Sequence, residues 1–451
     1  MFIGRYKKLF PILIIIFIAA VIRILYYYHF PSIQAQPDTW MYYYLGRQMM
    51  TGNFLKYFVN NERTPVYPLF LNMISYFSGS LGAPMPSDLF SIAMEKVILV
   101  QTLIGIIGIT VFYITLRIIG MSAVKSFLIT LFTSCNLLVF GWERILLTES
   151  LGTFFLIFLF FVIIRILKQD KVVDYIYLLF LLVAGFLLKP FYLFLPFFVF
   201  PVIVYYRRNK TALWGSIIVI AGFSISVLFY IERDSRLFDY RGINKISEIN
   251  MLGKILELNL NVEPAKEVPY LYNNVKEYRA KGGEPMPYRF LEKYYFYDDP
   301  VLFRELGRFN SLVIKGNFMN YFTGSLMQIP RGLVDMSELY ILKRPRESIL
   351  GDIFLNIAKF YKIMQYLNFI IFFSFPVTLY SFITGKSFRY AVLALLGVIS
   401  LYQIFFSVFF SYSEFGRLIS SGLPLIFLYS FFSYWEIFKK INSYRTGRFN
   451  K

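Results

Sequence analysis

Long, predominantly apolar runs recur along this chain and restrict its fold more than any other feature. A helix of roughly 20 apolar residues crosses the ~30 Å hydrocarbon core of a bilayer. No run shows the alternation of a barrel strand, and in lipid the remaining way to satisfy the backbone is a helix. The sequence therefore predicts an all-α polytopic integral membrane protein. We expect about ten transmembrane helices, over residues 9–30, 93–118, 123–142, 149–167, 173–189, 191–206, 212–231, 356–384, 388–410 and 418–438.

The composition supports membrane insertion and argues against nucleic-acid binding. Apolar residues make up 57% of the 451 residues, whereas soluble domains average about 45–50%. The formal net charge is +19. The basic residues form short clusters between apolar runs, where they set orientation and attract anionic lipids. We therefore expect membrane lipids, and no nucleic acid, among the partners.

The basic clusters also predict how the spans are oriented. Arg5, Lys7 and Lys8 precede the first run, which lacks a small-residue cleavage site and is interpreted as a retained span. The later basic loops and the basic tail agree with a single register under the positive-inside rule. This register predicts both termini in the cytoplasm, in an inner or plasma membrane. It places four segments on the extracytoplasmic side: 31–90, 141–149, 232–349 and 412–417.

Three parts are predicted along the chain. Residues 1–231 form an N-terminal transmembrane module that contains the first outer loop, 31–90. Residues 232–350 form an extracytoplasmic loop domain, and residues 351–451 form the C-terminal transmembrane helices with a basic cytoplasmic tail. Because the loop domain keeps apolar clusters between turn residues, we expect it to be a compact helical cap. The helices expected in it cover 264–280 and 286–309.

One cysteine and one histidine limit the metal chemistry of the chain. Cys135 lies inside an apolar run, which indicates an inert buried thiol, and His29 lies in an aromatic belt. A zinc site built from His and Cys is therefore not expected. A divalent cation held by carboxylates remains open.

The first outer loop holds the first candidate site residues. Asp38 precedes a Tyr-rich segment that Gly52 can close, which predicts a short helix with Asp38 as its N-cap. A carboxylate fixed at a helix start beside the membrane can also accept a proton. Further on, the loop reads Arg63-x-Pro65-x-Tyr67-Pro68 and enters an apolar segment that can dip into the membrane.

These features together resemble the GT-C glycosyltransferases: a first span that ends near Arg23, an aromatic helix opened by Asp38, and the motif that starts at Arg63. The branch they resemble holds the protein O-mannosyltransferases and lipid A aminoarabinose transferases (glycosyltransferase family 39). The resemblance covers the first seven spans best and residues 232–350 hardly at all. Two later segments agree with it, Glu143-Arg144 to Glu149-Ser150 and Glu414-Phe415-Gly416-Arg417 followed by Pro424.

The resemblance implies a GT-C-like fold and a specific reaction. The family moves a sugar from a polyprenyl-phosphate carrier to an acceptor on the outer face of the membrane. Its first-loop aspartate is catalytic or metal-associated, which implies that role for Asp38, and Glu149 matches its second acid. These two residues would hold a metal ion if one is used. Some relatives use a further histidine, which this chain lacks, so metal dependence stays open.

The chemistry of such a transfer also points to cations. Displacing a phosphate from an anomeric carbon requires a base for the incoming hydroxyl and positive charge for the leaving phosphate. Arginine suits the second task because its planar fork binds two oxygens at once. No P-loop or dinucleotide fingerprint is present, as expected for a donor already activated on a lipid. The expected substrate-binding residues are Arg63, Tyr67, Arg144, Lys189 and Arg417.

Structural roles compete with catalytic ones at several positions. Glu149 can complement the dipole of a helix that begins after Thr148, and Arg23 is expected to be structural. Lys189, which precedes a proline, can lie in a solvated turn or at the break of one element. Simple ion pairs are expected between two pairs of sequence neighbours, Glu143–Arg144 and Glu414–Arg417.

Two other functions remain as alternatives. A ligase or polymerase of lipid-linked glycans has similar spans and a large outer loop, but depends on a histidine there, and none follows Phe30. A transporter or flippase of a lipid-linked or small polar substrate would show paired broken helices or charges at mid-membrane, whereas the acids here concentrate at span ends. The sequence does not fix the sugar, the acceptor class (lipid, glycan or protein) or the oligomeric state.

Overall fold

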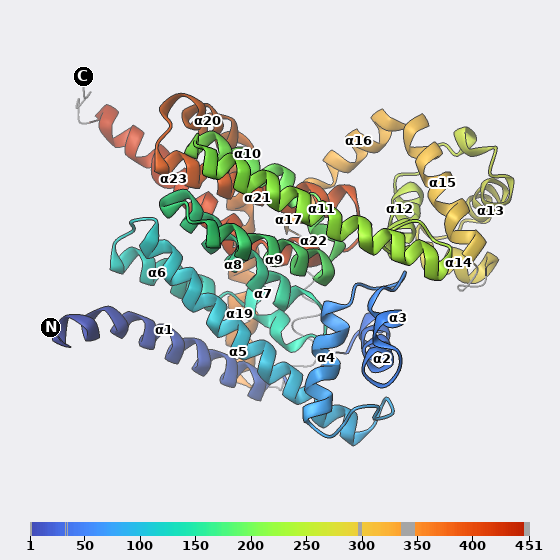
Figure 1. The fold of residues 1–451 in the computed structure, drawn as a ribbon, viewed down its shortest axis with the longest axis horizontal. Helices are drawn as coiled ribbons and strands as arrows, with labels where there is room; N and C mark the ends of the chain where they lie inside the picture. The colour runs from blue at the N-terminus through green and yellow to red at the C-terminus, as the bar shows by residue number, and fades with distance from the viewer. Residues whose placement is uncertain (1, 32, 34, 296–299, 335–347, 446–451) are drawn as a thin grey trace.

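The computed structural model describes residues 2–31, 33, 35–295, 300–334 and 348–445, and within these residues every regular element is helical (Figure 1). Seven helices are long and apolar enough to cross a membrane. A pair bent by 55°, Ala123–Ser134 with Leu137–Arg144, is an eighth candidate span. The predicted all-α polytopic membrane fold is confirmed.

The first half of the described chain alternates long apolar helices with short ones. Its elements are α1 (Phe2–His29), α2 (Pro37–Thr51), α3 (Phe54–Phe58), α4 (Val66–Phe77), α5 (Asp88–Ile118), α6 (Ala123–Ser134), α7 (Leu137–Phe140), the 3₁₀ turn η1 (Gly141–Arg144), α8 (Glu149–Gln169), α9 (Val172–Leu188), η2 (Pro190–Tyr192), α10 (Leu195–Arg207) and α11 (Lys210–Phe238).

The second half begins with shorter helices and returns to long apolar ones. Its described elements are α12 (Lys245–Glu257), η3 (Glu263–Ala265), α13 (Pro269–Ala280), α14 (Pro287–Tyr294), α15 (Pro300–Gly316), α16 (Phe318–Met327), α17 (Ile329–Val334), α19 (Ile349–Met364), η4 (Gln365–Phe369), α20 (Ile370–Gly385), α21 (Phe388–Phe409), α22 (Phe415–Ser420) and α23 (Leu423–Arg445). Residues 335–347, a part of the predicted loop domain, lie outside the described residues.

Each of the ten predicted spans overlaps helical residues, but 123–142 and 356–384 each cover more than one element. Two of the other helices are not full spans by length and hydropathy. α9 has only 17 residues, and α23 carries charged residues in its second half. The boundaries also differ. α11 runs on to Phe238, beyond the predicted end at residue 231, and Ile349–Gly385 forms one 37-residue candidate span where 356–384 was expected.

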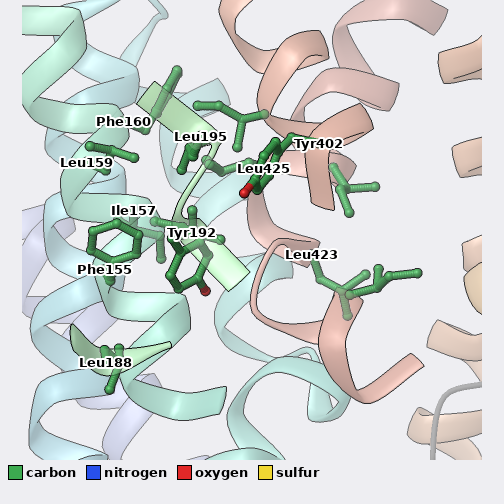
Figure 2. Packing of buried hydrophobic residues seen from close by; sticks show 14 of the residues in the cluster. Phe155, Ile157, Leu159, Phe160, Leu188, Tyr192, Leu195, Tyr402, Leu423 and Leu425 are labelled. Carbon is green, nitrogen blue, oxygen red and sulfur yellow. The ribbon is translucent and has the colours of Figure 1, made fainter. Parts of the chain in front are cut away.

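The largest hydrophobic core surrounds α8, which packs against α5, α9 and α10 and against α21 to α23. Phe155 of α8 lies beside Tyr192 of the η2 turn, with ring centroids 4.6 Å apart (Figure 2). Since lipid gives helices no hydrophobic reason to associate, this close side-chain packing holds them together. It fixes the start of α8 against the break between α9 and α10.

A second hydrophobic core belongs to the predicted helical cap. It is formed by buried residues between Tyr240 and Tyr321, from α12 to α16. α13 begins at Pro269 and α14 ends at Tyr294, so both are shorter than the predicted helices, and residues 296–299 lie outside the described residues. The cap lies with α2 and α3 at one end of the molecule (Figure 1). The N-terminal end of α1 and the C-terminal end of α23 lie at the other end (Figure 1).

The start of α2 is fixed by a reciprocal cap. The Gln36 N–H donates to Oγ1 of Thr39 at 2.9 Å, and the Thr39 N–H donates to the Gln36 carbonyl at 2.8 Å. The predicted N-cap role of Asp38 is therefore wrong, because Gln36 occupies that position and Asp38 lies in the first turn. An acid in the first turn still faces the positive end of the helix dipole. Gly52 ends the helix as predicted.

Candidate active site

A cavity of about 880 Å³ lies where distant parts of the chain meet. Its walls come from the start of α2, the loop before α4, the break between α9 and α10, the cap helices α12 and α14, and the segment from α21 to α22. One side is apolar and includes Leu188, Phe191, Phe194, Phe406 and Phe410. The cap contributes polar residues to the lining, Asn244, Ser247, Asn250 and Glu292, together with apolar ones such as Ile246 and Met251.

Asp38 and Arg63 form an ion pair in the wall of this cavity. Nη2 of Arg63 lies 2.6 Å from Oδ1 of Asp38, and the guanidinium lies over the Tyr42 ring, 5.2 Å from its centroid. Burial alone would raise the pKa of Asp38, but the positive charges of Arg63, Arg417 and Lys189 together lower that pKa below its ordinary value. Asp38 is therefore ionised at neutral pH.

Arg417 connects Asp38 to a second carboxylate. Its Nη1 lies 3.6 Å from Oδ2 of Asp38, and its Nε lies 3.3 Å from Oε1 of Glu149. Its Nη2 lies 3.2 Å from Oε2 of Glu414, so the predicted pair of helical neighbours is confirmed. The side chain is 16% exposed, which leaves its guanidinium accessible from the cavity.

Lys189 reaches the same cluster from the break after α9. The helix ends at Leu188 because Pro190 has no N–H and disfavours helical geometry in the residue before it. Nζ of Lys189 lies 3.2 Å from Oε1 of Glu149, and the side chain is 12% exposed. α9 and α10 are separate helices on the two sides of this break, at the positions of the predicted spans 173–189 and 191–206. The alternative, a solvated turn, is wrong for this lysine.

Glu149 lies behind the two cations that it contacts. It is the first residue of α8, as predicted, and only 1% exposed, and it is not among the residues that line the cavity. Oε1 lies within 3.3 Å of both Lys189 and Arg417. Its backbone carbonyl accepts a hydrogen bond from Oγ of Ser421 at 3.2 Å. This geometry suits a residue that positions cations better than one that touches a substrate.

Two predicted substrate-binding residues lie outside the cavity wall. Tyr67 is fully buried beneath Tyr42, with ring centroids 5.0 Å apart, and its hydroxyl donates to Oε1 of Gln101 at 2.9 Å. The guanidinium of Arg144 lies over the Tyr27 ring, 5.0 Å from its centroid. Neither side chain lines the cavity, because one faces the core and the other faces α1.

Glu143 pairs with Arg23 instead of its sequence neighbour. Nε and Nη2 of Arg23 each donate to one carboxylate oxygen of Glu143 at 2.6 Å, and the two side chains are 1% and 5% exposed. The predicted Glu143–Arg144 pair is therefore wrong. The structural role expected for Arg23 is confirmed, because this buried pair ties α1 to the η1 turn.

Several residues of the cavity wall were not predicted from the sequence. Tyr288 of α14 and Tyr412 of the segment before α22 line the cavity together with the polar residues of α12. No sequence signal marked them, because the family resemblance does not extend into the cap. Tyr42 could have been found, since it lies four residues after Asp38 on the same helix face.

The carboxylates that could hold a metal ion already form ion pairs with Arg and Lys side chains. Asp38 faces Arg63 and Arg417, and Glu149 faces Lys189 and Arg417. A divalent cation requires several oxygen ligands, and the described part of the chain has no group of three or more His, Cys, Asp or Glu that could hold one. The donor set does not fit a resident metal ion.

The fold is similar to that of a solved membrane glycosyltransferase. The archaeal oligosaccharyltransferase AglB from Archaeoglobus fulgidus, in complex with an inhibitory peptide and a dolichol-phosphate, superposes with a TM-score of 0.50 at 12% sequence identity. The match covers 99% of this chain and 53% of AglB, so this chain spans about half the length of that protein. The predicted GT-C-like fold is thereby confirmed. No protein-family model and no curated protein matches the sequence.

Proposed function

We propose that this protein is a membrane glycosyltransferase that moves a sugar from a polyprenyl-phosphate carrier to an acceptor on the extracytoplasmic face. The observation that carries the proposal is the contact of Arg417 with both Asp38 and Glu149. It joins the first outer loop, α8 and α22 in one charged cluster at the wall of one cavity. The similarity of fold to AglB, which was solved with dolichol-phosphate, agrees with a lipid-phosphate donor.

Arg417 and Lys189 hold the phosphate of the donor in this proposal. Both are nearly buried, line the cavity and already share Oε1 of Glu149. An incoming phosphate offers several oxygens, and charge-assisted hydrogen bonds from these two cations stabilise the negative charge that develops on it. Glu149 keeps the cations in place before and after the phosphate leaves. It is a positioning residue.

Asp38 prepares the acceptor. Arg63 fixes one carboxylate oxygen of Asp38, and the other can accept a hydrogen bond from the acceptor hydroxyl. As the acceptor oxygen bonds to the anomeric carbon, the bond from that carbon to the phosphate oxygen breaks, and its electron pair leaves with the phosphate. The hydroxyl proton passes to Asp38. The ionised state of this carboxyl is the state required to receive it.

The two sides of the cavity match the two substrates. The phenyl rings of Phe194 and Phe410 are 45% and 47% exposed on the apolar side, which suits the lipid chain of the donor. The polar residues contributed by the cap face the acceptor. In this proposal residues 232–350 form the acceptor-side domain, the module 1–231 holds the catalytic loop, and both termini lie in the cytoplasm.

Replacement of Asp38 by Asn tests this function. We expect Asp38→Asn in purified, bilayer-reconstituted protein to lower sugar transfer from radiolabelled polyprenyl-phosphate hexoses by about 10²–10³-fold, a range typical of a lost general base. Asp88→Asn is the matched control, because it makes the same change in the first turn of another helix, at an exposed position. Wild-type transfer by a folded Asp38→Asn variant would contradict the proposal.

A further inference from the structure

A second cavity, which we call the outer groove, lies beside the active-site cavity. It has a volume of about 970 Å³ and is lined by one face of α2, the loop after α3, and the end of α11. The residues that matter here are Trp40, Tyr44 and Gln48 of α2, Asn60 of the loop, and Arg236 and Phe238 of α11. Nothing derived so far for the transfer reaction uses this groove.

The outer groove lies at the C-terminal end of α11, after its long apolar run. The apolar sequence of this helix ends at Ile231 and is followed directly by Glu232, Arg233 and Asp234. Arg236 and Phe238 lie five and seven residues further along, which places them about 7–10 Å past the last apolar residue.

Two aromatic rings form an exposed platform in the groove. Trp40 is 48% exposed and Tyr44 is 62% exposed. Four residues separate them, so they lie on one face of α2, about 6 Å apart along its axis. The negative face of an aromatic ring attracts weakly polarised C–H groups. Such groups cover the flat face of a pyranose sugar.

The polar groups of the groove suit an uncharged ligand. Gln48 supplies an amide group, which donates and accepts hydrogen bonds as sugar hydroxyls do. Asn60 supplies the donor Nδ2, because its Oδ1 accepts the N–H groups of Glu62 and Arg63 at 2.8 and 3.3 Å. The four charged residues of the lining cancel, since Glu62 and Asp239 balance Arg236 and Lys245. This contrasts with the active-site cavity, where Arg63, Lys189 and Arg417 are gathered.

The backbone around the groove offers few free hydrogen-bonding groups to an extended peptide. An extended peptide pairs with free backbone groups of its receptor. In the loop, the Asn60 N–H and C=O lie 3.3 and 3.1 Å from the Tyr230 hydroxyl, and the Asn61 carbonyl accepts the Lys245 N–H at 2.5 Å. The other walls are helices, whose backbone groups bond internally.

The outer groove and the active-site cavity are neighbours that share one lining residue. Met41 lines both, and its sulfur lies 4.0 Å from Nη2 of Arg63, the partner of Asp38. Tyr44 lies six residues after Asp38 on α2, about 9 Å along the helix axis. Asp38 and Trp40 are two residues apart and point to different faces of α2, so a chain of sugar units that stacks on Tyr44 and Trp40 would pass around Met41 to bring its end to Asp38.

We propose that the outer groove binds a neutral oligosaccharide segment of the acceptor, so that the acceptor of this enzyme is a glycan. The link to catalysis rests on the transferase function proposed above. The binding itself does not depend on that function, and it can be measured separately.

Tryptophan fluorescence of the purified protein tests the binding. The probes are neutral hexasaccharides of glucose, mannose, galactose and N-acetylglucosamine, with an uncharged hexapeptide as the competing class. We expect at least one hexasaccharide to change the fluorescence of the wild type, the change to vanish in Trp40→Phe, and the affinity to fall about tenfold in Tyr44→Ala, which loses one stacked ring. Tyr76→Ala removes an aromatic ring that is 57% exposed and lines neither cavity, and it should bind as the wild type does.

Three results would overturn the proposal: no response to any hexasaccharide, equal affinity in Tyr44→Ala and the wild type, or a response to the hexapeptide alone. Donor turnover separates this failure from failure of the transferase proposal. A protein that consumes the polyprenyl-phosphate sugar but binds no hexasaccharide refutes the groove only. A protein that binds a hexasaccharide through Tyr44 but never consumes the donor refutes the transferase function and leaves the groove standing.

Discussion

At the scale of single residues, the candidate site is a network in which each cation has a carboxylate partner. Arg63 faces Asp38, Lys189 faces Glu149, and Arg417 contacts both of these acids. Buried charges need such partners, because the loss of one partner leaves the other uncompensated at a cost of about 3–5 kcal/mol. In the proposed reaction, this network keeps the cations in place at the cavity wall until a phosphate arrives.

The charge around Asp38 predicts how activity depends on pH. A carboxyl with a lowered pKa stays ionised as the pH falls, so the acidic limb of kcat/KM should lie below the ordinary aspartate range near pH 3.9. Arg63→Gln removes the charge that lowers the pKa of Asp38 most. Because this pKa then rises, the acidic limb of kcat/KM should move to higher pH. The same limb in both proteins, from kcat/KM measured across the acidic range, would show that Asp38 does not control the rate.

The sequence predicted the chemical types of this site better than the direction of each side chain. Asp38, Arg63, Lys189 and Arg417 were predicted, and they gather at one cavity. Tyr67 was also predicted, but its hydroxyl turns to Gln101 inside the core. A motif gives the order of residues along the chain. It does not show which face of a helix or turn a side chain occupies.

At the scale of elements, two buried polar contacts join helices that are distant in sequence. The Arg23–Glu143 pair ties α1 to the turn after α7. Lys254 of α12 contacts Oε1 of Gln328, and its Nζ lies over the Phe415 ring of α22, 4.7 Å from the centroid. These contacts position the helices that carry the cavity walls.

Removing one residue of the Arg23–Glu143 pair should lower the free energy of unfolding strongly, whereas replacing both residues by apolar ones should change it little. Arg23→Met leaves a buried carboxylate without its partner, and we expect a loss of about 3–5 kcal/mol. Combining it with Glu143→Leu removes both charges and should restore most of the stability. Thermal unfolding in detergent measures both variants. A double variant as unstable as Arg23→Met would argue against the pair as the cause.

Lys254 predicts a pH-dependent stability of the cap. Burial lowers the pKa of Lys254 to about 8, from 10.5. Between pH 8 and pH 10.5 the unfolded chain binds more protons than the folded one, so the free energy of unfolding rises with pH in this window. Below pH 8 the buried ammonium group is charged, and the full cost of burying that charge is present. Lys254→Met should therefore stabilise the protein at pH 7, by about 3 kcal/mol at most. Thermal unfolding should show this advantage shrinking towards pH 10.5, and an advantage independent of pH would contradict the explanation.

The sequence located the helices well and their breaks less well. The hydropathy pattern found every span because lipid demands long apolar helices. Pro190 correctly predicted the break after α9. The bend between α6 and α7 was not predicted, because residues 123–142 were expected to form one span. The cap helices α13 and α14 were expected to be longer, because their apolar residues mark a core without marking where a helix ends.

At the scale of the whole molecule, two hydrophobic cores meet at one cavity. The spans form the first core and the cap forms the second. The ends of α9, α10 and α21 contribute apolar residues to its wall, and the cap contributes several of the uncharged polar ones. This division suits a reaction between a lipid-borne donor and a water-borne acceptor, and it depends on long-range contacts that no local sequence pattern contains.

We propose above that the cavity holds a lipid-borne phosphate on Arg417 and Lys189. The affinity of the protein for a polyprenyl phosphate measures this binding directly. Decaprenyl phosphate would be titrated into bilayer-reconstituted wild type, Arg417→Gln, and the control Arg304→Gln, whose side chain is 64% exposed on the cap. We expect Arg417→Gln to weaken binding by at least tenfold, which corresponds to the loss of one charged hydrogen bond of about 1.5–3 kcal/mol, and Arg304→Gln to bind as the wild type does. Equal affinity in Arg417→Gln and the wild type would contradict the proposal.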